Sequence, residues 1–454
     1  MIRNLVEKGR YLDSVALMRA SRRLSALAGV EAASLMIGTP SNKALLREAG
    51  LLAAEGEQAG PNDLIIAVRA ADAAAALDSA IGFLSEKLPA SEDGLRRTRS
   101  ISAALELLPQ ANLALISVPG EFAAHEARKA LQAGLNVLLF SDNVPIEDEV
   151  ALKRLANERN LLLMGPDCGT ALIGGTPVAF ANAVPRGAIG IVSASGTGLQ
   201  EVSTLIARLG GGVSHGIGVG GRDLDARVGA LGTLAALDAL EQDAETKTIV
   251  LISKPPAPEV ARRVLERMKK SSQRSIVCFL GSDEPGLART LTEAAELAAG
   301  RKLPPDAVEV RKRKGSVRGL FCGGTLCSEA RLIVGPGKGN IFIDLGGGEY
   351  TRGKPHPMIE PELRNEHVRQ ALADPGVGVV LVDIVLGYGS HPDPAGVLLK
   401  NDVSAKAVVA SVTGTERDPQ VYSRQVTALR EAGVVVASSN ARAADLAASA
   451  LKEA

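Results

Sequence analysis

Short runs of apolar residues alternate with longer amphipathic stretches along almost the whole chain. Val- and Ile-rich runs such as Ala188–Ser193, Thr248–Ser253 and Val379–Ile384 end in Gly, Ser, Asp or Pro, and stretches rich in Ala, Leu and Glu follow them. This repeated order of strand and helix is typical of α/β domains with parallel sheets and right-handed crossovers. The pattern therefore predicts an α/β protein over most of its length.

Breaks in this pattern divide the chain into four segments. The first is small and predicts an α+β domain, with a candidate strand at Asp13–Met18. Pro89, Ser91 and Gly94 mark a linker after it. The three later segments have the α/β pattern, and the basic stretch before the last of them is interpreted as a solvated linker. We predict domains at 1–90, 98–185, 186–305 and 315–454.

The third and fourth segments open with the same local pattern. A predicted strand is followed by Ser195-Gly196-Thr197 and then Glu201 in the third, and by Gly323-Gly324-Thr325 and then Glu329 in the fourth. Both sequences contain G-T-x-x-x-E, and the offset is 325 − 197 = 128 positions. Two such units, each opening a segment of similar layout, indicate a duplicated fold.

Each of these strand-to-helix turns is a candidate anion site. We expect Thr197 to be the N-cap, with Gln200 three residues later completing a capping box. The free backbone N–H groups of a first helical turn, together with the helix dipole, attract phosphate. If the two domains face each other, Ser195, Gly196 and Thr197 could share one phosphate with the turn at 323–325. The alternative is two capped helices that bind nothing.

Two glycine clusters follow the second strand of each repeat. Gly220 and Gly221 precede Arg222 and Asp223, and the run Gly346-Gly347-Gly348 precedes Glu349. Both are predicted at the carboxyl ends of strands, where open α/β sheets bind ligands. The alternative is a tight strand-to-helix turn, although each cluster contains more glycine than a turn requires.

Three residues are candidates for catalysis. His215, near a predicted strand end, could be a general base or a phosphate carrier, or a buried histidine bonded to a carbonyl. His356, with Arg352 and Lys354, could supply cationic contacts to a carboxylate or phosphate, or lie on a solvated loop. Arg222 could grip a carboxylate with two parallel bonds, or form a local ion pair with Asp225.

Composition excludes several classes of function. The 454 residues include 51 basic and 51 acidic side chains, so the formal net charge is zero. Balanced charge gives no reason to expect nucleic acid or a membrane as a partner. Aromatic residues make up 2% and Trp is absent, which argues against base-stacking platforms. At about 150 residues per domain, the length corresponds to about three domains.

Cysteine and histidine spacing predicts no metal site. Cys168, Cys278, Cys322 and Cys327 form no C-x-x-C pair, and no two His have metal-ligand spacing on a helix. The start of the chain is charged and predicts no targeting segment. The apolar run Val377–Leu386 is too short to span a bilayer. We expect a protein of the reducing cytoplasm.

At these residues the chain resembles a known family. Residues 113–200 are similar to the α subunit of succinyl-CoA synthetase, notably at Gly165-Pro166-Asp167-Cys168 and Ser195-Gly196-Thr197. Residues 315–440 are similar to the carboxyl-terminal domain of its β subunit. Within this superfamily the chain resembles the FdrA family, through Gly220-Gly221-Arg222-Asp223 and the motif from Gly346 to Pro357. The resemblance implies a Rossmann-like CoA-binding-type domain followed by two flavodoxin-like ligase domains.

The chain departs from the synthetase pattern in the parts that handle phosphate, nucleotide and CoA. The resemblance implies a phosphocarrier His late in the ligase domain, but Gly281–Gly286 contains none. Only about ten residues separate 186–305 from 315–454, so no ATP-grasp domain lies between them. Thr98 to Asn112 lacks the glycines of a CoA phosphate loop. We therefore expect no cofactor of the chain's own, although CoA binding remains open.

The resemblance implies three candidate functions. The first is an FdrA-type subunit that binds an acyl phosphate between two helix N-termini. It would transfer a carbamoyl group between carbamoyl phosphate and a small amide acid of the oxamate type, together with partner subunits or as a homo-oligomer. The second is a component of an acyl-CoA synthetase. The third is a non-catalytic scaffold.

Overall fold

The computed structural model describes residues 1–10, 12, 14–25, 27–85, 98–308, 310, 312–337, 339–351 and 356–451. The predicted linker at 86–97 and two candidate cations, Arg352 and Lys354, lie outside these residues. The chain forms two compact units. The first spans Met1–Pro109 and a short stretch beginning at Tyr350, and the second holds Gln110–Glu349 and the chain from His356 onward. Each unit is described by itself.

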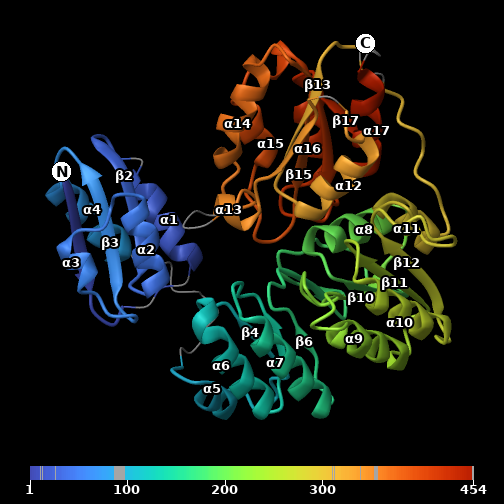
Figure 1. Cartoon of the computed structure of the whole chain (residues 1–454), viewed down its shortest axis with the longest axis horizontal. Helices are drawn as coiled ribbons and strands as arrows, with labels where there is room; N and C mark the ends of the chain where they lie inside the picture. The colour runs from blue at the N-terminus through green and yellow to red at the C-terminus, as the bar shows by residue number, and fades with distance from the viewer. Residues whose placement is uncertain are drawn as a thin grey trace. The chain divides into compact units, whose positions relative to one another are not determined.

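The first unit is built on a three-stranded antiparallel sheet in the order β1-β3-β2. Strand β3 is buried along almost its whole length because helices cover both of its faces (Figure 1). The elements are β1 (Ile2–Glu7), α1 (Ser14–Ser25), β2 (Val30–Ile37), α2 (Pro40–Glu48), α3 (Ala54–Glu57), β3 (Leu64–Ala70), α4 (Ala73–Ser85) and α5 (Ile101–Leu107). The expectation of a small α+β domain is confirmed in its architecture.

One predicted strand in this unit is wrong. Residues from Ser14 onward, within the expected strand Asp13–Met18, belong to helix α1. Leu17, Ala20 and Leu24 are buried, and this spacing of three and four residues places them on one helical face. The edge strand β1 was missed because only Asn4 of its six residues is buried, so its apolar pattern is weak.

The second unit begins with a small parallel sheet in the order β4-β5-β6. Helices α6 and α7 pack against each other beside it (Figure 1). The elements are β4 (Leu113–Ile116), α6 (Gly120–Gln132), β5 (Asn136–Leu139), α7 (Ile146–Glu158) and β6 (Leu163–Met164). A hairpin of β7 (Thr170–Ile173) and β8 (Thr176–Ala179) follows and extends the next sheet.

Two larger sheets complete this unit and share one strand order. The first is β12-β11-β9-β10-β7-β8 and the second is β14-β13-β15-β16-β17, so in both the first strand of the repeat lies between the second and the third. The first contains β9 (Ile189–Ser193), α8 (Gly196–Arg208), β10 (Val213–Gly218), α9 (Leu231–Gln242), β11 (Thr248–Ser253), α10 (Pro258–Lys269), β12 (Arg274–Phe279) and α11 (Leu291–Ala299).

The second contains β13 (Ser316–Phe321), α12 (Gly324–Val334), β14 (Ile341–Asp344), α13 (Gly348–Thr351), α14 (Glu362–Ala373), β15 (Val377–Val385), α15 (Pro394–Leu398), β16 (Ala407–Thr413), α16 (Tyr422–Glu431), β17 (Val435–Ala437) and α17 (Asn440–Ala450). The shared order is the flavodoxin-like one, so the α/β fold class and the duplication are confirmed. No helix in the described ranges is long and apolar enough to cross a bilayer.

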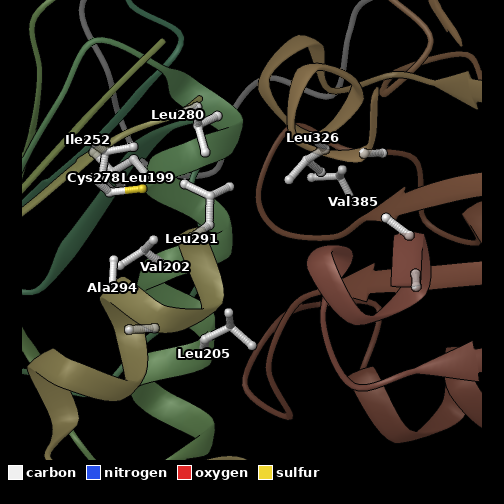
Figure 2. Close-up of a cluster of buried hydrophobic side chains, with 14 of the residues drawn as sticks. Leu199, Val202, Leu205, Ile252, Cys278, Leu280, Leu291, Ala294, Leu326 and Val385 are labelled. Carbon is white, nitrogen blue, oxygen red and sulfur yellow. The ribbon is translucent and has the colours of Figure 1, made fainter. Parts of the chain in front are cut away.

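The two repeats share one hydrophobic core. Figure 2 shows Leu199, Val202 and Leu205 along one face of α8 beside Leu291 of α11, with Leu326 of α12 opposite. These residues belong to a single buried cluster that also takes in α17. Burial of apolar surface is the main favourable term in such an interface, so the helices α8, α11, α12 and α17 fix the two sheets relative to each other.

Two buried glutamates, one from each repeat, accept hydrogen bonds across this interface. Glu201 of α8 accepts a hydrogen bond from the first amide of α17, Asn440 N, at 2.9 Å. Glu329 of α12 accepts one from the first amide of α11, Leu291 N, at 2.7 Å. Asn440 Nδ2 also donates to Glu329 at 2.7 Å and so connects the two carboxylates. Each repeat thus caps a helix of the other through the Glu of its G-T-x-x-x-E sequence.

A second buried network joins α7 to the six-stranded sheet. The ammonium of Lys153 lies 2.9 Å from Glu149 and 2.5 Å from Asp223, and it donates to the Val219 carbonyl at 2.9 Å. Asp223 also accepts from the backbone amides of Gly232 and Thr233 at the start of α9. Breaking such a buried pair leaves an uncompensated charge in a site that excludes water.

We predict that Asp223→Ala destabilises the protein by about 3–5 kcal/mol, because it removes a partner of buried Lys153 and the cap of α9. Asp225→Ala is the matched control, since Asp225 is half-buried and its carboxylate forms an ion pair with the exposed Arg227. Urea unfolding followed by circular dichroism measures both. Equal unfolding free energies for the two variants would contradict the prediction.

The Glu329 carboxyl predicts a pH-dependent stability. Burial raises its pKa to about 7 from 4.5, so between these values the folded state keeps a proton that the unfolded chain releases. The free energy of unfolding should therefore fall as the pH rises from about 4.5 to 7, by up to about 3 kcal/mol. Glu329→Gln should reduce this slope.

The control for this experiment is Glu431→Gln on α16, where the glutamate is exposed. Some slope should persist in Glu329→Gln, because burial also raises the pKa of Glu201. Unfolding free energies measured at several pH values between 4.5 and 8 give the comparison. A slope in Glu329→Gln as steep as that of the control would show that Glu329 is not the titrating group.

Candidate functional site

The two repeated turns meet at the carboxyl ends of their sheets. The Ser195 hydroxyl donates to the Thr325 hydroxyl at 2.5 Å. A Cβ added to Gly323 would lie 3.1 Å from the Cβ of Thr197. The first turns of α8 and α12 therefore converge on one place, and we call Ser195–Thr197 together with Gly323–Thr325 the paired turns.

The cap of α8 differs from the predicted one. Ser195 has an extended backbone, and its hydroxyl accepts from Gly198 N at 2.9 Å, so Ser195 is the N-cap. Thr197 is the second helical residue, and the side chain of Gln200 turns into the interface to donate to Asn182 at 3.1 Å. The expected cap at Thr197 with its capping box is wrong, because Ser195 is the residue whose hydroxyl reaches the free amide.

The paired turns retain unpaired amides on both sides. Within the described residues, the N–H groups of Gly196 and Thr197 have no hydrogen-bond partner, and neither do those of Gly324 and Thr325. These are N1 and N2 positions, whose amides have no acceptor inside the helix. Four donors therefore point out of two helix ends that touch each other.

The α12 side is more acidic than the α8 side. Asp383, buried on β15, accepts from Cys322 N at 2.8 Å and Gly323 N at 2.7 Å. Arg364 lies 3.0 Å from the same carboxylate and balances its charge. The Asp344 carboxylate contacts the position that a Cβ on Gly324 would take. The duplication is therefore asymmetric, because only α12 carries carboxylates at its start.

The cluster at Gly220 and Gly221 lies against the β6 turn. Gly220 has φ +86°, and a Cβ there would meet the Pro166 carbonyl and lie 3.1 Å from Gly165 Cα. A Cβ on Gly221 would have only Asp167 near it, at 3.8 Å. Close packing thus explains why glycine is needed at position 220, which agrees with the tight-turn alternative. It does not explain the glycine at position 221.

The second cluster lies beside His356. A Cβ on Gly346 would lie 2.5 Å from the Cys322 carbonyl and 2.5 Å from His356 Nε2, so only glycine fits there. A Cβ on Gly347 would lie 3.1 Å from the Asp344 carbonyl, and one on Gly348 would meet open space. Ligand binding by these glycines stays a prediction.

His215 does not lie at the paired turns. It lies in the first half of β10, where Nδ1 accepts from Gly174 N at 3.1 Å and Nε2 is 4.0 Å from Asp243. Asp243 precedes β11, so His215 faces the amino-terminal edge of the parallel strands, whereas Ser195 follows the carboxyl end of β9. The geometry therefore does not support His215 as a base or phosphate carrier at the paired turns.

His356 is close to the site but does not carry a charge. Burial lowers its pKa to about 4, and its Nδ1 accepts from Met358 N at 3.1 Å. An imidazole that is neutral at pH 7 cannot supply the expected cationic contact. Its Nε2 faces Gly346 and remains available as a neutral donor.

Arg222 is engaged within the protein. Its guanidinium lies 2.8 Å from the buried Glu149 carboxylate and donates to the Val144 carbonyl at 2.8 Å. Asp225, the local partner considered from sequence, instead pairs with Arg227 at 3.0 Å. The carboxylate that Arg222 grips therefore belongs to α7 of the protein itself.

Two charged residues of this region were missed from sequence. Asp167 has φ +57°, and burial raises its pKa to about 6, with Asp142 adding to the effect and Arg222 and Lys254 opposing it. Lys254 is exposed and directly follows β11. Asp167 lies in the motif Gly165-Pro166-Asp167-Cys168, but only its backbone and burial single it out as a titrating group. Lys254 belongs to no motif and is distinguished by the sheet edge that it occupies.

The cysteines are buried and unpaired. Burial raises the pKa of Cys168 to about 12, which fits a packing role for this residue and not a nucleophilic one. In the described part of the chain, no group of three or more His, Cys, Asp or Glu side chains could hold a metal ion.

Comparison with known proteins gives two family matches. Residues 320–450 match the CoA-ligase model, and residues 1–100 match a model described as the AllF heavy metal-associated domain. Residues 1–100 contain no Cys and no His. Soft and borderline metals bind through thiolate and imidazole, so the residues present do not fit the metal site that this description implies.

The chain is similar to several curated and solved proteins. It is 42% identical to YahF of Escherichia coli over 97% of this chain and 96% of that protein. It is 28% identical to subunit alpha 1 of an Archaeoglobus fulgidus succinate–CoA ligase, over 49% of this chain and 68% of that one. An acetyl-coenzyme A synthetase of Ca. Korarchaeum cryptofilum superposes with a TM-score of 0.35 at 15% identity, over 79% of this chain and 85% of that one.

The sequence comparisons define the family of the chain. Alpha subunits of two succinate–CoA ligases from Archaeoglobus fulgidus match 49% and 35% of this chain, and the CoA-ligase model matches residues 320–450 in the last repeat. The match to YahF extends over nearly the whole of both chains. The chain therefore belongs to the FdrA-type, succinyl-CoA synthetase α-like family of CoA-ligase proteins.

Proposed function

We propose that this protein is an FdrA-type subunit that binds an acyl phosphate at the paired turns and takes part in carbamoyl transfer in the cytoplasm. The acyl phosphate is carbamoyl phosphate, and the acceptor is a small amide acid of the oxamate type. Partner subunits, or further copies of the chain, complete the enzyme.

The convergence of two helix N-termini is the observation that carries this proposal. The hydroxyls of Ser195 and Thr325 touch at 2.5 Å. The unpaired amides of Gly196, Thr197, Gly324 and Thr325 belong to the same two helix starts. Amides and dipoles at helix ends favour negative charge. Since the two hydroxyls are in contact, the phosphate would lie beside both oxygens and not between them.

The missing parts of the synthetase pattern favour a ready-made acyl phosphate. The stretch Gly281–Gly286 contains no phosphocarrier His, and fewer than 20 residues separate α11 from β13 where a nucleotide domain would stand. His215 cannot substitute, because it faces the other edge of the sheet. A subunit without these parts can still use an acyl phosphate made by another enzyme.

The proposed reaction balances without an oxidant or a nucleotide. The amide nitrogen of the acceptor attacks the carbamoyl carbon and forms a C–N bond, while the C–O bond to phosphate breaks. The phosphate leaves with the bonding electron pair, and the amide proton passes to phosphate or to a base. Fixed N–H dipoles at the paired turns would stabilise the charge that grows on the leaving phosphate.

A role in acyl-CoA synthesis is the second candidate. The matched subunits of succinate–CoA ligases and the CoA-ligase model favour it. It requires CoA binding to this chain, although residues 98–112 contain no glycine for a CoA phosphate loop. Calorimetric titration with CoA separates the candidates: binding in the micromolar range would favour the ligase component.

Replacing Gly196 with Pro tests the first candidate. Gly196 is the first residue of α8 and the backbone before it is extended, so proline fits the helix start while deleting one free N–H. We expect Gly196→Pro to lower acceptor-dependent phosphate release from carbamoyl phosphate by about 10- to 1,000-fold, the range seen when one oxyanion donor is lost.

Gly196→Ala is the matched control. It adds a Cβ at the same position, 3.0 Å from the Thr170 hydroxyl, but keeps the N–H. Phosphate release is measured with the assembled subunits, and phosphate binding is measured with the full chain alone. Equal effects of Pro and Ala would mean that the amide is not used, and the absence of any acceptor-dependent turnover would remove the proposal.

A further inference from the structure

Lys254 follows strand β11, which ends beside the start of α8. Strand β11 ends at Ser253, and its penultimate residue, Ile252, accepts a hydrogen bond from Ala194 N at 3.0 Å. Ile252 Cγ2 would lie 3.2 Å from a Cβ on Gly198, within the first turn of α8. The next residue after the strand, Lys254, is therefore held beside this helix end, and it is exposed to solvent.

The charge of Lys254 also reaches α12. Burial raises the pKa of Asp344 and raises the pKa of Cys327 to about 12, and in both cases the Lys254 ammonium opposes the effect. Asp344 contacts the first residue of α12, and Cys327 lies in its first turn. The Lys254 ammonium is thus within electrostatic range of the start of α12.

The paired turns contain one carboxylate that lacks a close cation. Asp383 has Arg364 at 3.0 Å. Among the described residues, Asp344 has no ion pair within 4.0 Å and accepts one hydrogen bond, from Gly346 N at 3.1 Å. An incoming phosphate would meet this negative charge at the mouth of α12. Repulsion between a phosphate and a neighbouring carboxylate costs several kcal/mol in a poorly solvated site.

We propose that Lys254 is the cation of the phosphate site, which balances Asp344 and contacts the phosphoryl group of the substrate directly. This inference rests on the proposed function. The flexible stem of a lysine lets the ammonium move from the carboxylate to the ligand as the ligand enters. Helix amides would then orient the phosphate, and Lys254 would supply the net charge that the amides lack.

The equivalent position in the other repeat cannot serve. There the third strand, β15, ends at Val385 and is followed by buried Leu386 and then Gly387. Arg222, on the side of Asp167, is already bound to Glu149 at 2.8 Å. Arg364 is buried against Asp383. Arg331 of α12 also acts on Asp344, but its guanidinium donates to the Phe342 carbonyl at 3.0 Å. Lys254 is exposed and, among the described residues, forms no ion pair within 4.0 Å.

Titration of the full chain with inorganic phosphate tests this role. We expect Lys254→Met to weaken phosphate binding by about 10- to 100-fold, which corresponds to one charge-assisted contact. Lys254→Arg should bind within about threefold of the native chain. In Lys254→Met/Asp344→Asn the local charge is balanced again, so affinity should recover to within about tenfold.

The variants are compared at equal thermal stability, and Lys254 is exposed, so its replacement should not prevent folding. If Lys254→Met binds phosphate as the native chain does while Gly196→Pro does not, the inference is wrong and the proposed site stands. If Lys254→Met loses binding while Gly196→Pro keeps it, phosphate binds away from the paired turns and the inference is also wrong. A native chain that binds no phosphate would overturn both.

Discussion

The buried contact between α8 and α12 determines the rest of the functional region. Two strand-to-helix turns, 128 residues apart in sequence, touch through the hydroxyls of Ser195 and Thr325. Neither turn alone differs from an ordinary capped helix. Together they direct two helix ends at one place, and this convergence depends on the apolar core that α8, α11, α12 and α17 share.

The same interface uses charged groups to fix its geometry. Glu201 and Glu329 each cap a helix of the opposite repeat, and Asn440 joins them. Buried carboxylates are costly unless every oxygen is paired. Their hydrogen bonds are therefore specific to one register of the two repeats, and a shift of one repeat would leave both carboxylates unpaired. Apolar packing holds the repeats together, and the glutamates define how they align.

The asymmetry between the repeats gives the site its chemical character. The α8 side contributes hydroxyls and an exposed lysine, whereas the α12 side contributes buried carboxylates and a neutral imidazole at His356. Duplication alone would give two equal anion sites. Asp383 accepts from two amides just before α12, so a buried carboxylate lies beside the free amides on that side. The two starts therefore differ in charge, with an exposed lysine near α8 and carboxylates near α12.

The family resemblance implied the flavodoxin-like layout of the repeats. The sequence pattern by itself determined the α/β class and the presence of two related turns. These follow from local apolar periodicity and from glycine at strand ends, which depend on near neighbours in the chain. The edge strand β1 and the N-cap at Ser195 were missed, because the first shows little burial and the second depends on which hydroxyl reaches a free amide.

Only the tertiary structure decided which candidates share a site. It brought Ser195 to Thr325, turned His215 to the opposite edge and bound Arg222 to Glu149 of α7. It also neutralised His356 through burial. The physical reason is that burial, strand direction and the partner of a charge depend on segments far apart in the chain. Local patterns carry no information on which of these segments will meet.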